Sequence, residues 1–348
     1  MEALWFALAA LVLAVYVVLD GFDFGAGALH LFVARSDRER RQVLAAIGPY
    51  WDGNEVWLLA GGGVLFLAFP KVLASGLSGF YLAIFLLLWT LILRGISIEF
   101  RSHVADPLWR EFWDATFGLA STLAPIVLGA ALGNVVRGVP LSADGWFSLP
   151  LFASFSPSGE LGILDWYTVL IGVTALAVLA HHGALFLVWK TDGDVQARSL
   201  VAAARTWPLV VVLIGAATLA TRFVAPEHFR ALAERPVALA ATALAGVGLA
   251  TSFVARRRGR ELTAFLGSAA FVLGLLAATA ASLYPIWLRS SLDPSSSLSA
   301  NDHAAAPAAL RAALWWWPVG LALAIGYAVL LFRLHRGKAQ AAAEGEGY

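Results

Sequence analysis

Long apolar segments recur along this chain of 348 residues and limit its possible folds more than any other feature. A helix of about 20 apolar residues crosses a bilayer core of roughly 30 Å. Only 14% of the residues are charged, against about 25% in soluble domains. We therefore expect an all-α polytopic membrane protein with nine transmembrane helices. The segments that meet the length requirement are 3–31, 51–69, 72–93, 116–136, 163–189, 203–221, 236–255, 262–284 and 312–332.

Lysine and arginine are unevenly divided between the connections of this predicted bundle. If the N-terminus faces outward, 17 of the 24 Lys and Arg residues lie at inner connections or inner helix ends, and 7 lie at outer ones. Short loops rich in Lys and Arg stay on the cytoplasmic side of a membrane. The chain is therefore predicted to be N-out/C-in. With eight helices instead of nine, the connections rich in Lys and Arg would no longer alternate regularly with the poor ones.

Neither a sequence repeat nor a Pro/Gly-rich linker divides the chain. We expect a single transmembrane helical domain over 1–336 and a disordered cytoplasmic tail over 337–348, where small and charged residues dominate. The N-terminal segment has no positive region and no small-residue cleavage site, which is typical of a retained helix rather than a signal peptide.

The composition also excludes several kinds of site. Cysteine is absent, which excludes disulfides, iron–sulfur centres and Cys-ligated metals, and no basic tract suggests a nucleic-acid partner. Four histidines fall in predicted loops or tails and are interpreted as solvated: His103, His228, His303 and His335. His181 and His182 lie in the fifth segment without an obvious second ligand on a facing helix. We expect a polar packing role for His182 and no heme or metal held by this chain.

Acidic residues interrupt the first two apolar segments. Asp20 and Asp23 are three residues apart and share a helix face, and Asp52 and Glu55 repeat that spacing. If the two helices are antiparallel, both pairs fall in the cytoplasmic half of the membrane. Each ionised acid costs roughly 2.5–3.5 kcal/mol at mid-bilayer on insertion scales. Groups that hold and release protons at this depth suit a proton relay, so we predict a proton pathway through these four acids.

Simpler structural roles remain open for the same residues. In one alternative, Arg94 or Arg101 forms ion pairs with the acids and holds the helices together. In another, Asp52 caps the start of the second helix. Glu99 and Arg101 would form an interfacial ion pair. Supporting polar or ion-pair roles are predicted for Asn54, Arg94, Glu99, Arg101 and His182.

Three motifs resemble subunit II of cytochrome bd-type quinol oxidases. They are D-G-F-D-x-G at 20–25, G-P-x-W-D-G-N-E-V-W-L at 48–58 and R-G-x-x-x-E-F-R at 94–101. Their order and spacing match the family, as do H-G-A-L-F-L at 182–187 and K-T-D-G at 190–193. Beyond about residue 200 the resemblance depends on topology and length.

The resemblance implies two four-helix bundles plus one peripheral helix, in a heterodimer with subunit I. Subunit I would hold two hemes b, one heme d and the quinol site, and subunit II would hold no redox centre. The complex oxidises quinol, reduces O2 to water and takes protons from the cytoplasm, which makes it an electrogenic enzyme of the respiratory chain. The family's proposed proton route corresponds here to Asp23 and Asp52.

The resemblance also implies a place and further partners. The place is the bacterial or archaeal cytoplasmic (inner) membrane, where lipid and quinone surround the complex. A small accessory single-helix subunit is a further partner of such oxidases. Two other functions remain open for the acids: a stand-alone proton-coupled transporter, and a purely structural subunit whose acids serve packing.

Overall fold

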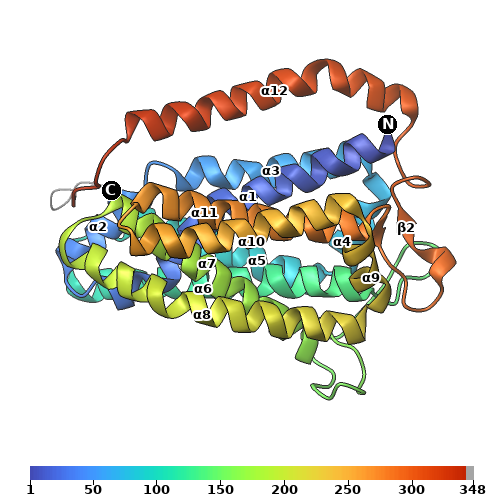
Figure 1. The fold of residues 1–348 in the computed structure, drawn as a ribbon, viewed down its shortest axis with the longest axis horizontal. Helices are drawn as coiled ribbons and strands as arrows, with labels where there is room; N and C mark the ends of the chain where they lie inside the picture. The colour runs from blue at the N-terminus through green and yellow to red at the C-terminus, as the bar shows by residue number, and fades with distance from the viewer. Residues whose placement is uncertain (342–348) are drawn as a thin grey trace.

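The chain is mostly helical in a computed structural model, which describes residues 1–341 (Figure 1). The helices are α1 (Glu2–Val33), α2 (Asp37–Ile47), α3 (Trp51–Ala68), α4 (Pro70–Gly79), α5 (Tyr81–Phe100), α6 (Pro107–Arg137), α7 (Trp166–Lys190), α8 (Gly193–Val224), α9 (Pro226–Glu234), α10 (Pro236–Arg257), α11 (Glu261–Leu283) and α12 (Pro307–Leu334). A two-stranded antiparallel hairpin, β1 (Ile286–Leu288) and β2 (Leu298–Ser299), encloses the short 3-10 helix Pro294–Ser296.

Eight helices of the described chain are long and apolar enough to cross a membrane, which confirms a polytopic all-α membrane protein. They are α1, α5, α6, α7, α8, α10, α11 and α12. The second predicted segment forms α3, whose 18 residues begin with a polar turn that holds Asp52, Asn54 and Glu55. Helix α3 is not among the eight, so nine transmembrane helices stay a prediction.

The third predicted segment, 72–93, is not one helix. Helix α4 ends at Gly79, and α5 begins at Tyr81 and runs on to Phe100. The ring of Phe147 packs where a side chain on residue 79 would lie, and it meets Phe80 at a centroid distance of 5.0 Å. This close contact needs a glycine at the bend. Because α5 runs on to Phe100, Arg94 lies within the helix instead of just beyond the predicted end at residue 93.

Helix α1 lies at the centre of the bundle and packs against α3, α6, α7 and α11. At its crossing with α7, Gly25 and Gly183 face each other. A Cβ atom on either residue would collide with the backbone of the opposite helix. Small residues of this kind let two helices approach closely without lipid between them. The crossing therefore fixes the depth of α1 relative to α7.

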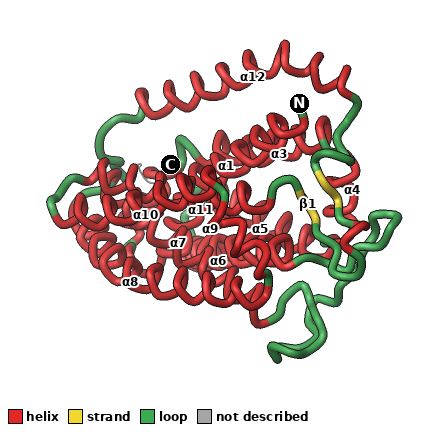
Figure 2. Tube along the Cα trace, turned by 45° about the vertical axis from the view of Figure 1, so that its right-hand side comes forward, coloured by secondary structure: helices red, strands yellow, loops and turns green. Residues whose placement is uncertain are grey.

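Helix α12 stands apart from the other helices (Figures 1 and 2). Leu310 and Ala313, near its start, are its only buried residues among those described. Trp5 of α1 attaches this region, because its indole Nε1 donates to the Leu310 carbonyl oxygen at 3.3 Å. Further along, Tyr327 lies against Gly53 of α3. Most of the helix is thus left for lipid or another chain.

The two ends of the bundle differ. Helix α2 joins α1 to α3 at one end, where α12 also finishes, and we name this the α2 end (Figure 1, left). A capping box between Ser36 and Glu39 starts α2. The loop 138–165, helix α9 and the β1–β2 hairpin lie at the opposite end.

Candidate functional site

Two buried carboxylates of α1 meet a buried arginine of α5. Asp20 Oδ1 accepts from Arg94 Nη1 at 2.6 Å, and neither side chain is exposed. The other terminal nitrogen, Nη2, reaches Glu55 Oε1 of α3 at 2.5 Å. One guanidinium therefore joins three helices. It also lies 4.2 Å from the ring centroid of Phe24, which covers it from the side.

Asp23 joins α1 to α3 by a second contact. Asn54 Nδ2 donates to Asp23 Oδ2 at 2.7 Å and to the Leu19 carbonyl oxygen at 3.2 Å. The two helices are connected by short α2 and run side by side (Figure 1). In the structure the acidic pair of α1 therefore faces α3, as expected for two antiparallel helices. Asn54 contacts Asp23 directly, and Glu55 is joined to Asp20 through Arg94.

The cluster holds more acid than base. Asp20, Asp23 and Glu55 together have one guanidinium, that of Arg94, within ion-pair reach among the described residues. Oδ2 of Asp20 and Oδ1 of Asp23 are buried without a hydrogen-bond partner there. Buried acid without a counter-charge is costly when ionised. Three carboxylates and one guanidinium leave two excess negative charges, so each proton bound by the carboxyls lowers that cost, and binding and releasing protons is what a relay requires.

Asp52 does not join this buried cluster. It is exposed in the first turn of α3, and the N-cap of the helix is Tyr50, so the predicted capping role of Asp52 is wrong. Glu55, one turn further on, has 28% of its side chain exposed. Asp52 and Glu55 therefore form a polar edge of α3, in which Glu55 contacts the buried cluster and Asp52 lies at the surface of the isolated chain.

Tyr50 lies at the α2 end of the same helix. Burial, and after it the negative charge of Asp23, raises the pKa of Tyr50 to about 12. The phenol therefore stays neutral and donates a hydrogen bond at any physiological pH. The backbone amide of Asn54 donates to the Tyr50 carbonyl oxygen, so Tyr50 lies one helical turn before Asn54 of the acid cluster.

A second ion cluster surrounds Asp114 of α6 at the α2 end. Its carboxylate accepts from Arg101 Nε at 2.6 Å, from Arg40 Nη1 at 2.9 Å and from His30 Nε2 at 2.7 Å. Arg101 also binds Asp37 of α2 at 2.9 Å. Arg101 thus pairs with two aspartates, and the predicted pair of Arg101 with Glu99 stays a prediction.

Glu99 is exposed on α5, and its carbonyl lies 2.7 Å from the Nδ1 atom of His103. Asp114 and His30 were not predicted as functional residues. The D-P pair at 106–107 marks the start of α6, since the Asp106 side chain accepts from the Trp109 amide. That signal places Asp114 two turns inside the helix.

The histidines of α7 are oriented by hydrogen bonds. His182 Nε2 lies 2.9 Å from the Val18 carbonyl oxygen, and Nδ1 lies 2.7 Å from Ser268 Oγ. Its ring stacks on Phe265 at 4.9 Å. Whichever nitrogen bound heme iron would first have to give up its own contact. The described residues contain no cluster of three or more metal-ligating His, Cys, Asp or Glu.

One histidine contradicts the sequence interpretation. His228 of α9 is buried rather than solvated, and its Nε2 lies 3.2 Å from Ser282 Oγ. Burial, and after it the nearby charge of Arg235, lowers the pKa of His228 to about 4. The imidazole is therefore neutral at physiological pH and ties α9 to α11.

Comparisons with known proteins agree with the sequence motifs. The family described as cytochrome bd terminal oxidase subunit II matches residues 1–335. The cytochrome bd-I ubiquinol oxidase subunit 2 of Escherichia coli K12 is 37% identical over 196 residues, which cover 56% of this chain and 50% of that protein. The cytochrome bd ubiquinol oxidase subunit 2 of Bacillus subtilis 168 is 36% identical over 211 residues, 61% of this chain and 60% of that protein.

Another relative and a solved structure extend the likeness over the whole chain. The probable cytochrome oxidase subunit 2 of Haemophilus influenzae is 30% identical over 351 residues and covers 94% of this chain and 92% of that protein. By contrast, the chain spans about half the length of the E. coli relative that it matches. The bd oxidase structure from Geobacillus thermodenitrificans has a TM-score of 0.75 at 18% identity, with 96% of this chain and 98% of that chain covered, and so supports the fold.

Proposed function

We propose that this chain, which belongs to the cytochrome bd terminal oxidase subunit II family, is the second subunit of a respiratory quinol:dioxygen oxidoreductase. In this function it stabilises a heme-bearing subunit I and conducts protons from the cytoplasm for reduction of O2 to water. The observation that carries the proposal is the buried acid cluster of Asp20, Asp23 and Glu55 around a single arginine. It forms within the motifs that characterise the family.

The surface of α3 is the proposed contact with subunit I. Asp52 is exposed and Glu55 partly exposed there, on the same helix as the exposed apolar side chains of Leu59 and Phe66. Apolar side chains can face lipid, but carboxylates at a lipid surface are costly. A partner subunit that covers this edge would remove the acids from lipid and connect the cluster to the partner's interior.

The topology that we propose has nine transmembrane helices, with α3 as the second. Helices α1, α3, α5 and α6 form one four-helix bundle, α7, α8, α10 and α11 form the other, and α12 is peripheral. The packing of α5 against α6 and of α10 against α11 agrees with this division, although α7 packs against α6 and α1 as well as against α8. The N-out/C-in orientation in the inner membrane follows the distribution of Lys and Arg and places the α2 end in the cytoplasm.

The redox groups belong, in this proposal, to the partner. Two hemes b and one heme d in subunit I would supply electron transfer and O2 chemistry, and quinol would be the substrate of the complex. His182 would serve as a polar packing residue between α7, α1 and α11. A small accessory single-helix subunit, lipid and quinone are further proposed partners of the assembly.

Each residue of the relay has a separate task. Asp52 and Glu55 at the exposed edge would exchange protons with water, and Asp23 and Asp20 would hold them inside. Asn54 keeps Asp23 Oδ2 in place, which leaves Oδ1 as the atom that takes and releases the proton. Arg94 stabilises whichever of Asp20 and Glu55 is ionised.

Purification from the native membrane tests the assignment to an oxidase. The tagged chain is isolated in mild detergent, and a reduced-minus-oxidised spectrum is recorded. Bands of heme b and heme d that co-purify with a larger subunit are expected. A folded preparation without heme and without a partner would contradict the assignment and favour a transporter.

The relay is tested by turnover at equal heme content. Glu55→Gln and Asp52→Asn are expected to leave the complex assembled and to slow O2 consumption, because each removes a proton-exchanging group. Glu160→Gln, in the exposed loop at the opposite end, is the matched control. Unchanged turnover in both edge variants would reduce these residues to a structural role.

A further inference from the structure

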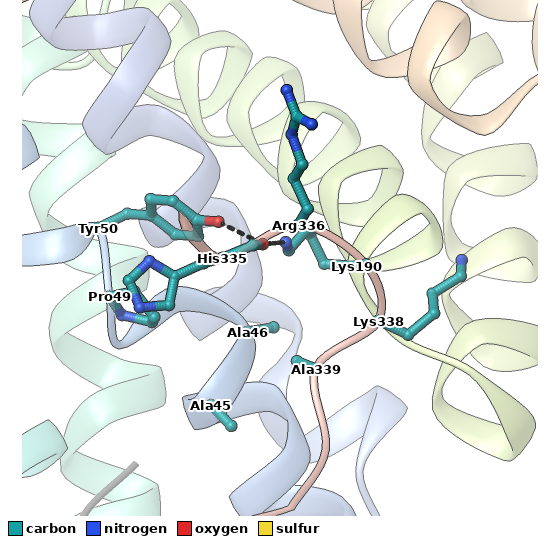
Figure 3. A pocket seen from close by; sticks show the side chains of 10 residues that line it. Ala45, Ala46, Pro49, Tyr50, Lys190, His335, Arg336, Lys338 and Ala339 are labelled. Carbon is teal, nitrogen blue, oxygen red and sulfur yellow. Dashed lines mark hydrogen bonds between the residues drawn. The ribbon is translucent and has the colours of Figure 1, made fainter. Parts of the chain in front are cut away.

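A cavity at the α2 end has no part in the proposed oxidase function. It has a volume of about 190 Å³ and lies between the α2–α3 connection, the end of α7 and the segment that follows α12 (Figure 3). One liquid water occupies roughly 30 Å³, so a group as large as a phosphate fits. The lining residues are Ala45, Ala46, Pro49, Tyr50, Lys190, His335, Arg336, Gly337, Lys338 and Ala339.

Lys190 is a buried cation without a carboxylate partner among the described residues. It is the last residue of α7 and is 3% exposed. Its Nζ atom donates to the His335 carbonyl oxygen at 2.5 Å, and the Tyr50 hydroxyl donates to the same oxygen at 3.2 Å (Figure 3). An ammonium group has three protons to donate, and a buried charge is costly unless it is paired. The position therefore favours an anion.

The neighbouring charges strengthen that preference. Arg336 and Lys338 also line the cavity, and Lys338 Nζ pairs with Glu261 of α11 at 2.5 Å. Of the three cationic side chains in the lining, only Lys338 pairs with a carboxylate among the described residues, which leaves a positive surplus at the cavity. The backbone there is held in place, since the Ala339 amide donates to the Lys190 carbonyl oxygen at 2.6 Å.

We propose that this cavity binds the phosphate group of an anionic phospholipid. Basic pockets at the ends of transmembrane helices recognise such headgroups. The last turns of α12, which lead into the lining residue His335, expose Leu330 and Leu334, and these side chains offer an apolar surface for acyl chains. Free inorganic phosphate has the same headgroup chemistry but would gain nothing from that surface. Lys190 supplies the buried charge and Arg336 is a second cation of the lining, while the one hydroxyl proton of Tyr50 is already donated to the His335 carbonyl oxygen.

Lipid retention by the purified complex tests the site. Native mass spectrometry measures phosphatidylglycerol binding to the complex, with phosphatidylcholine as the neutral lipid. Lys190→Gln and Arg336→Gln are each expected to weaken phosphatidylglycerol binding about tenfold or more, because each removes a charge-assisted hydrogen bond. Arg333→Gln is the control, since Arg333 is an exposed cation of α12 that does not line the cavity. Lys190→Arg is expected to retain binding.

Two additional measurements distinguish the possible ligands. If inorganic phosphate displaces phosphatidylglycerol at similar concentrations, the phosphate site is supported and its source is the free ion. Equal lipid binding by Lys190→Gln, Arg336→Gln and Arg333→Gln would overturn the proposal. Lipid binding that is seen only after residues 342–348 are removed would also overturn the proposal. In that case the acidic residues of that segment, and not a lipid, would be the anion bound in the full chain. Arg336 is exposed, so its variant remains informative if Lys190→Gln fails to fold.

Discussion

Replacement of Arg94 by methionine is the sharpest test of how the acid cluster is held. The guanidinium is unexposed and is the only cation within ion-pair reach of Asp20 among the described residues. Its loss leaves Asp20 either ionised without a partner or protonated. Removal of one partner from a buried pair costs about 3–5 kcal/mol of stability. Because Glu55 is 28% exposed and water can solvate it, most of that cost should come from Asp20.

A double-mutant cycle separates these contributions. Unfolding of the purified complex in mixed detergent micelles gives the free energy for wild type, Arg94→Met, Asp20→Asn and the double variant. We expect Arg94→Met to be the least stable, and Asp20→Asn in the same chain to recover most of the loss, since no buried charge then remains unpaired. A loss below about 1 kcal/mol in Arg94→Met, or a double variant no more stable than Arg94→Met, would refute this reasoning.

Three further outcomes follow from other parts of the fold. Asp114→Asn should lower the free energy of unfolding by about 3–5 kcal/mol, because it leaves Arg101 partly unpaired. Unfolding in detergent measures this loss, and a loss under about 1 kcal/mol would show that the ion pairs of Asp114 do not stabilise the fold. His228, with a pKa lowered from 6.5 to about 4, stabilises the fold fully above pH 6.5 and progressively less as the pH falls to 4. The Tm of wild type should therefore fall more between pH 7 and 4.5 than that of His228→Gln, and parallel curves would contradict this. Gly183→Ala should cost about 1–3 kcal/mol, whereas Gly215→Ala, which meets no neighbour, should not destabilise; equal stabilities would show that α1 and α7 tolerate separation.

The acidic pairs show what the sequence could predict. A spacing of three residues places Asp20 and Asp23 on one face of a helix, and short α2 requires the next helix to return beside it. The contacts of Asp23 with Asn54 and of Arg94 with Asp20 and Glu55 are consistent with that argument. Local periodicity was informative for Asp23 and Asn54 because the short connection through α2 brings α3 back beside α1, whereas the contact of Arg94 with Asp20 joins α1 to the more distant α5.

Other features depend on contacts that periodicity does not contain. Arg101 pairs with Asp114 because α5 and α6 pack together, and no local spacing distinguishes that partner from Glu99. The break at Gly79 depends on Phe147, which arrives from a distant loop. His228 lies in a short polar helix, and it is buried because α9 packs against α8, α10 and α11.

Turnover of the Asp23→Asn complex tests the central claim most directly. The variant keeps the size and the Asn54 contact geometry of residue 23 but removes its titratable proton. At heme content equal to wild type, the account predicts O2 consumption slowed at least about tenfold, with Asp144→Asn in the exposed loop at the opposite end as the unaffected control. Asp23→Asn turnover equal to that of wild type would contradict a proton route through this chain.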